Sequence, residues 1–178
     1  MAFKTRDLSY MAIAAALLTV CSWLSIPAAV PFTLQTFALF CALNLLGGRR
    51  GTIAVLVYLL LGAVGLPVFS GFRSGFGALF GPTGGFLTGF LLTGLVGWLF
   101  EQFPRHGLPV RIIAMLIGLL LCYAFGTAWF MVVYARTNGA ITLSRALGLC
   151  VFPFIIPDLL KLAFAILLSE RLKRHIPL

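Results

Sequence analysis

Acidic residues are nearly absent from this sequence, because only four of its 178 residues are Asp or Glu. Charged residues of either sign make up 10% of the chain, whereas hydrophobic residues make up 61%. A soluble domain is about 45–50% apolar and about 25% charged, and a chain of this length keeps most of its residues near the surface. The composition therefore excludes an ordinary soluble domain. It predicts an integral membrane protein with a single domain over residues 1–178.

The sequence also lacks the patterns that carry catalysis or cofactor binding. The four cysteines are scattered without the spacing of a zinc or redox site. The motif "GPTGG" (residues 81–85) is not followed by Lys and Ser or Thr, as a P-loop requires. His106 and His175 lie in other segments than Asp158, so no catalytic set converges. We expect no enzyme, no cofactor and no metal site, and the alternative is an intramembrane enzyme.

Positive charge is in excess, with a formal net charge of +9. Such a balance can indicate a nucleic-acid partner. Here, however, the basic residues form short clusters between apolar runs, where the cytoplasmic loops of membrane proteins carry them. We therefore expect membrane lipid around the chain and no nucleic acid.

Six apolar segments predict six transmembrane helices, at about residues 8–24, 34–46, 52–64, 84–100, 110–134 and 157–172. The first is longer than the core of a signal peptide, so we interpret it as a retained helix. The second and third have about 13 residues each, fewer than the roughly 20 needed to span a membrane alone. They could be tilted, extend into their flanking turns, or end inside a cavity. Residues 65–83 are rich in Gly and aromatic residues and predict a structured loop.

The distribution of basic residues predicts the orientation. Three of the 13 Lys and Arg residues, Arg73, Arg136 and Arg145, fall on one side of the six-helix topology, and Lys161 lies within the last helix. The opposite side receives the other nine: Lys4, Arg6, Arg49, Arg50, Arg105, Arg111, Arg171, Lys173 and Arg174. Because cytoplasmic loops carry the excess of Lys and Arg, we expect both termini in the cytoplasm.

One acid breaks the pattern set by the other three. Asp7, Glu101 and Glu170 all fall at predicted cytoplasmic helix ends, whereas Asp158 lies inside an apolar run, three residues before Lys161 and on the same helix face. A charge at the centre of a membrane helix costs about 2.5–3.5 kcal/mol, so such residues usually face a protein interior or a wet cavity.

We interpret Asp158 and Lys161 as part of a ligand pocket. A structural alternative stays open. Pro157 followed by Asp158 is a favoured start of a helix, with the carboxylate offsetting the helix dipole. Lys161 could then simply pair with that carboxylate.

Four motifs follow one another along the chain: "VPFTLQTFA" (residues 30–38), "GLPVFSG" (65–71), "GPTGG" (81–85) and "PDLLK" (157–161). Together they resemble the BioY family, the biotin-specific S components of energy-coupling factor (ECF) transporters, over nearly the whole chain. The resemblance implies an all-α, polytopic S-component fold of six transmembrane helices in the bacterial cell (inner) membrane. It further implies capture of biotin from outside, and a transmembrane coupling protein and ATPases as partners.

The resemblance also places Asp158, Lys161 and Arg73 at pocket positions. Biotin has a ureido ring with two N–H donors and one C=O acceptor, an apolar thioether ring, and a carboxylate. An ionised Asp accepts N–H groups, and Lys or Arg suits a carboxylate. We assign Asp158 to the ureido ring and leave open whether Lys161 or Arg73 takes the carboxylate. Arg73 could also be an ordinary loop arginine.

Gln35 in "TLQT" and Tyr58 on the third predicted helix are weaker candidates for the pocket. Gln35 could equally brace the loop, and Tyr58 could belong to the core. Phe72 and Phe76 flank Arg73 and could either wall the pocket or pack elsewhere. Two functional alternatives remain as well: an S component for a different small vitamin, and a carrier that acts without ATPases.

Ala12 and Ala16 lie four residues apart in "AIAAA" on the first predicted helix. Small residues at this spacing let another helix approach closely. By resemblance to S components, we expect this pair to form the docking face for the coupling protein. Ordinary alanine packing within the chain is the alternative.

Overall fold

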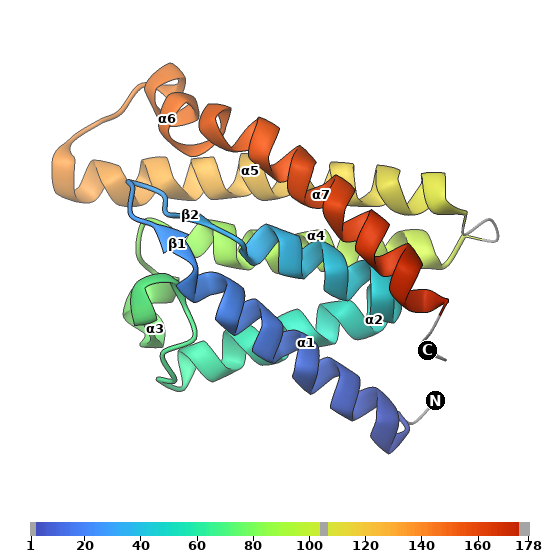
Figure 1. Ribbon diagram of the computed structural model, residues 1–178. Coiled ribbons are helices and arrows are strands. Elements are labelled where there is room, and N and C mark those ends of the chain that lie inside the picture. Colours follow the sequence, from blue (N-terminus) through green and yellow to red (C-terminus); the bar gives the residue numbers. More distant parts are fainter. Residues whose placement is uncertain (1–2, 104–106, 175–178) are drawn as a thin grey trace.

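The computed structural model describes residues 3–103 and 107–174 (Figure 1). Arg105, His106 and His175, which enter the sequence predictions, lie outside these residues. Helices joined by short connections make up most of the described chain, and its two named strands form one short hairpin. Its elements are α1 (Thr5–Trp23), β1 (Ser25–Ile26), β2 (Phe32–Thr33), α2 (Gln35–Ala63), the 3-10 turn η1 (Ser70–Phe72), α3 (Gly75–Leu79), α4 (Gly84–Glu101), α5 (Leu108–Asn138), α6 (Leu143–Cys150) and α7 (Phe152–Lys173).

The second and third predicted helices are the two halves of α2. The helix is interrupted at Gly47, whose φ of 82° and ψ of 169° suit glycine and strain other residues. The chain turns back there (Figure 1), and Gly51 then lies against Ala42 and Leu43 of the first half. The predicted turn at "GGRRG" is therefore confirmed.

The last predicted helix begins too late. α7 starts at Phe152 and contains Pro157, and α6 before it was not predicted. Pro153 occupies the first turn of α7, where a missing N–H costs nothing, and it starts the helix in place of Pro157. Asp158 thus lies well inside a helix, which contradicts its interpretation as a helix-start residue.

The helix surfaces fit a membrane. Four described helical stretches are long and apolar enough to cross one: 35–63, 84–101, 108–138 and 143–173, the last running through α6 and α7. Large apolar side chains point outward from α5 and α7, among them Leu120, Ile156 and Phe164. The chain is a multi-pass membrane protein, and lipid covers this surface.

Three acids tie the helices together at the end of the molecule where α1 begins and α7 ends, here called the termini end. Asp7 of α1 pairs with Arg50 of α2 at 3.2 Å. Glu101 of α4 accepts the backbone N–H of Arg49 at 2.9 Å. Glu170 of α7 pairs with Arg111 of α5 at 2.9 Å, and Arg111 also donates to Asn44 of α2 at 3.3 Å.

The opposite end of the molecule is irregular. The β1–β2 hairpin, η1, α3 and the connection from α5 to α6 gather there (Figure 1). The hairpin pairs Ser25 with Thr33 and Ile26 with Phe32. The segment that follows α2 is held against the end of α1, because Ser22 donates to the Val68 carbonyl at 2.6 Å and Trp23 to the Pro67 carbonyl at 2.8 Å.

Candidate functional site

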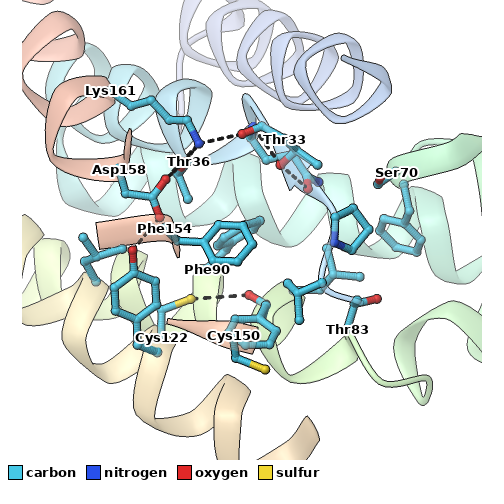
Figure 2. Close-up of a pocket in the computed structure, with 18 of the residues that line it drawn as sticks. Thr33, Thr36, Ser70, Thr83, Phe90, Cys122, Cys150, Phe154, Asp158 and Lys161 are labelled. Atoms are coloured by element: carbon cyan, nitrogen blue, oxygen red, sulfur yellow. Dashed lines mark hydrogen bonds and ion pairs between the residues drawn. The ribbon is translucent and has the colours of Figure 1, made fainter. Parts of the chain in front are cut away.

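Asp158 and Lys161 form a buried ion pair on α7. The Lys161 Nζ lies 2.8 Å from the Asp158 Oδ1, and the two residues are 8% and 2% exposed, respectively. One turn of helix brings both side chains to the same side of α7, toward the hairpin and the start of α2 (Figure 2). The sequence prediction that the two side chains lie together in the interior is confirmed.

The Lys161 ammonium has all three of its N–H groups committed. Besides Asp158, it donates to the Thr33 carbonyl at 2.7 Å and to the Thr36 hydroxyl at 3.1 Å. It also lies 4.2 Å from the centre of the Phe32 ring. An ammonium offers three donors, so this arrangement leaves Lys161 none for another acceptor.

The Asp158 carboxylate keeps spare acceptor capacity on one oxygen only. Oδ1 accepts from both Lys161 and Thr36, the latter at 2.8 Å, whereas Oδ2 accepts from the Tyr123 hydroxyl of α5 at 2.6 Å. Each carboxylate oxygen has about two acceptor positions. Oδ2 can therefore accept one further N–H.

Thr33, Thr36 and Tyr123 were not among the predicted site residues. The two threonines lie within the motif "VPFTLQTFA", where a signal existed. Tyr123 lies in a long apolar run of α5, and nothing in the sequence distinguishes it from other aromatic residues there.

Gln35 lines the site, and Tyr58 supports it from behind. The Gln35 amide donates one N–H to the Tyr58 hydroxyl at 2.6 Å and accepts from the Thr33 hydroxyl at 3.1 Å. Its second amide N–H has no partner among the described residues. Tyr58 is fully buried and packs edge-on against Phe69, so it does not reach the pocket.

A pocket opens beside the ion pair, with a volume of about 770 Å³ counted to its mouth. Asp158, Lys161, Gln35 and Thr36 supply polar groups at one part of its wall. Apolar side chains form much of the rest, among them Val30, Phe69, Phe86, Leu87, Phe90, Leu119 and Phe154 (Figure 2).

Arg73 also lines the pocket, on the segment between η1 and α3. It is exposed, and its guanidinium has no hydrogen bond or ion pair to the residues that the structure describes. Its backbone carbonyl accepts from the Phe69 N–H at 3.1 Å, which fixes its position beside the pocket.

The two phenylalanines beside Arg73 do not wall the pocket. Phe72 stacks on Trp23 with ring centres 5.1 Å apart, and Phe76 stacks on Phe80 at 6.2 Å. Both rings point outward and are 64% exposed.

Ala12 and Ala16 lie on the outer face of α1, and both are exposed. Ala14 and Ala15 between them are buried and face the core. The predicted pair therefore does not pack against other helices of the described chain, and its face is open to lipid or a partner.

Among residues 3–103 and 107–174, no three His, Cys, Asp or Glu side chains lie close enough to hold a metal ion. The four cysteines are all buried and free. The chemistry that the pocket offers is therefore recognition: one carboxylate acceptor, one amide donor and one free guanidinium around an apolar cavity.

Comparisons with known proteins agree with one another. The family model described as "BioY family" matches residues 1–178. The chain is 40% identical over 171 residues to "Biotin transporter BioY" of Thermotoga maritima, covering 95% of this chain and 96% of that relative. It is 40% identical over 160 residues to "Biotin transporter BioY2" of Lactococcus lactis subsp. cremoris, covering 89% of this chain and 85% of that relative.

A solved structure has the same fold. It is the crystal structure of the S-component for biotin from an ECF-type ABC transporter, with a TM-score of 0.82 and 26% sequence identity. The similarity covers 98% of this chain and 96% of that one.

Proposed function

The chain belongs to the BioY family and serves biotin uptake, and we propose that it holds biotin in the pocket beside Asp158 and Lys161. The observation that carries this proposal is the buried carboxylate with one free acceptor position, next to a largely apolar cavity. Its relatives are named as transporters, and the chain is a transport protein rather than an enzyme.

The ureido ring is the part of biotin that suits the polar part of the pocket wall. The free acceptor position on the Asp158 Oδ2 takes one ureido N–H. The unused amide N–H of Gln35 donates a hydrogen bond to the ureido C=O. Lys161 contributes by pairing with the Asp158 carboxylate at 2.8 Å, which fixes its position. The apolar walls around Phe86, Phe90 and Phe154 suit the thioether ring.

The biotin carboxylate belongs to Arg73 under this proposal. Sequence alone left Lys161 and Arg73 as equal candidates. The committed donors of Lys161 and the free guanidinium of Arg73 favour Arg73. A guanidinium also matches a carboxylate with two parallel hydrogen bonds.

The membrane arrangement follows from helices and charges together. We propose six transmembrane helices: α1, the two halves of α2, α4, α5 and α7. The basic clusters of the described chain lie at the termini end, so that end faces the cytoplasm. Thr33 of β2 and Ala78 of α3 line the pocket. Because β2 and α3 lie at the opposite end of the molecule (Figure 1), the pocket faces the exterior.

The partners proposed are an ECF transmembrane coupling protein and its ATPases. The exposed Ala12 and Ala16 of α1 support a docking face for the coupling protein, because small side chains admit a second helix at close range. Transport by this chain without ATPases is the alternative.

Binding of radiolabelled biotin to the detergent-purified chain tests the proposal. We expect saturable binding that unlabelled biotin displaces and other vitamins do not. Equal displacement by another vitamin would favour an S component of different specificity. Biotin uptake by cells that contain this chain but no coupling protein would favour the stand-alone carrier.

A further inference from the structure

A second cavity lies at the termini end, far from the biotin pocket in the fold. It is a recess between the start of α1, the Gly47 turn of α2 and the end of α4, with a volume of about 1160 Å³ counted to its mouth. Lys4, Arg6, Arg49 and Arg50 line it, together with Asp7 and Glu101. The recess therefore holds four cations and two acids.

Both acids are already engaged by the protein. Asp7 pairs with the Arg50 guanidinium at 3.2 Å and accepts the Lys4 backbone N–H at 3.1 Å. Glu101 accepts the Arg49 backbone N–H at 2.9 Å. The other two acidic side chains of the chain, Asp158 and Glu170, are paired elsewhere.

Three cations of the recess are consequently without a carboxylate partner in the described chain. The Arg49 guanidinium lies 4.8 Å from the Phe3 ring centre and that of Arg6 lies 6.0 Å from the Tyr10 ring centre. Contacts with these rings use no hydrogen-bond donor of Arg49 or Arg6. The Lys4 side chain also makes no ion pair with the described residues, so the donors of all three cations stay available. A concave site with three such cations suits an anion with several oxygens, such as a phosphate group.

The recess also has an apolar part that continues into the lipid-facing surface. Trp98 and Leu46 line it, and tryptophan is enriched where a membrane meets water. Leu95 lies one turn before Trp98 on the same face of α4 and is exposed. A ligand whose phosphate sits among the cations can thus extend an acyl chain along α4.

We propose that this recess binds the headgroup of an anionic phospholipid. The phosphate lies between Lys4, Arg6 and Arg49, and the acyl chains pass Trp98 toward Leu95. Basic pockets between helices at the cytoplasmic surface bind such headgroups, and the continuous apolar path favours a lipid over a free phosphate ion. Bound lipid joins α1 to α4 at this end and stabilises the fold, because it binds the folded state alone.

The test is thermal unfolding of the purified chain in neutral detergent, titrated with short-chain phosphatidylglycerol, short-chain phosphatidylcholine or inorganic phosphate. We expect a rise in the unfolding temperature with phosphatidylglycerol only. Arg49→Gln should weaken the apparent affinity for phosphatidylglycerol about fivefold, the factor for roughly 1 kcal/mol. Arg174→Gln, which removes one exposed cation at the same end but outside the recess, is the matched control and should change it little.

Three results would overturn the assignment: an equal response to phosphatidylcholine, an equal response to inorganic phosphate, or an equal loss in Arg174→Gln and Arg49→Gln. The first indicates acyl chains alone, the second a free-anion site, and the third a diffuse charge effect. If Arg49→Gln fails to fold, Lys4→Gln replaces it in the same titration and is compared with Arg174→Gln. Lys4 is suitable because it is exposed and its side chain makes no ion pair with the described residues.

Discussion

The Tyr123 hydroxyl of α5 donates a 2.6 Å hydrogen bond to the Oδ2 of Asp158 on α7. This bond links α5 directly to α7. Near the pocket, the other connection between these two helices runs through α6. It also orients the oxygen of Asp158 that keeps a free acceptor position. Helix docking and pocket geometry therefore depend on the same contact.

Replacing Tyr123 with Phe should destabilise the protein. The substitution removes the donor and leaves the ring, so the free energy of unfolding should fall by about 1–2 kcal/mol, as for other interhelical hydrogen bonds in membranes. Thermal unfolding in detergent measures the change. Tyr134→Phe on the same helix is the control, since the Tyr134 hydroxyl bonds to no described residue. Equal unfolding temperatures for the two variants would contradict the role of Tyr123.

Arg73→Met should weaken biotin selectively. If Arg73 holds the carboxylate, affinity for biotin should fall about tenfold, the factor for roughly 1.4 kcal/mol. Biotin amide, which has no carboxylate to lose a partner, should bind almost as before. Titrations of both ligands measure the split, with Arg136→Met, an exposed arginine outside the pocket, as control. A selective loss in Lys161→Met instead would reassign the carboxylate to Lys161.

Much of this site was predictable from the scarcity of charge. With four acids in the chain, the position of Asp158 beside Lys161 stood out, and the structure places the pair beside a pocket. The motif that contains Thr36 was visible in the sequence, but which hydroxyl groups reach the pair was not predictable. Thr52 and Thr88 in α2 and α4 donate to their own helix backbone, whereas Thr36 reaches another helix, and only tertiary structure separates these cases.

The helix boundaries were likewise predictable only in part from the sequence. The turn at Gly47 was predicted because glycines and arginines interrupt two apolar runs. The predicted start of the last helix was wrong because Pro153 and Pro157 are both compatible with a helix start in sequence. α6 was missed because its eight residues, with Arg145 and Ser144, form no long apolar run.

Bulky residues at Ala12 and Ala16 should separate binding from transport. We expect Ala12→Leu with Ala16→Leu to leave biotin binding by the isolated chain intact, because both side chains are exposed. Assembly with the coupling protein and ATP-dependent uptake should be lost. Ala124→Leu with Ala128→Leu is the matched control: it enlarges an exposed alanine pair of the same spacing on α5. Loss of binding with normal assembly would show that the α1 face serves the fold instead.

Cysteine labelling in intact cells tests the orientation. The four native cysteines are buried, so background labelling should be low. Asn138→Cys, at the end of α5 toward the pocket, should react with an impermeant reagent, whereas Gly107→Cys, at the opposite end of α5, should be protected until the membrane is opened. Labelling of Gly107→Cys from outside would reverse the proposed topology.

The most direct test of the account is a biotin titration of purified Asp158→Asn, with its thermal stability measured alongside. The substitution keeps the shape but removes the charge, and its amide donor can face a ureido N–H. A lost hydrogen bond to a charged group costs about 1.5–3 kcal/mol, so affinity for biotin and biotin amide should both fall by roughly one to two orders of magnitude. A purely structural pair predicts another pattern: each single variant, Asp158→Asn or Lys161→Met, is destabilised by its unpaired charge, and the double variant recovers stability with biotin affinity unchanged. Normal biotin affinity in a well-folded Asp158→Asn protein would contradict the assignment of this pocket to biotin.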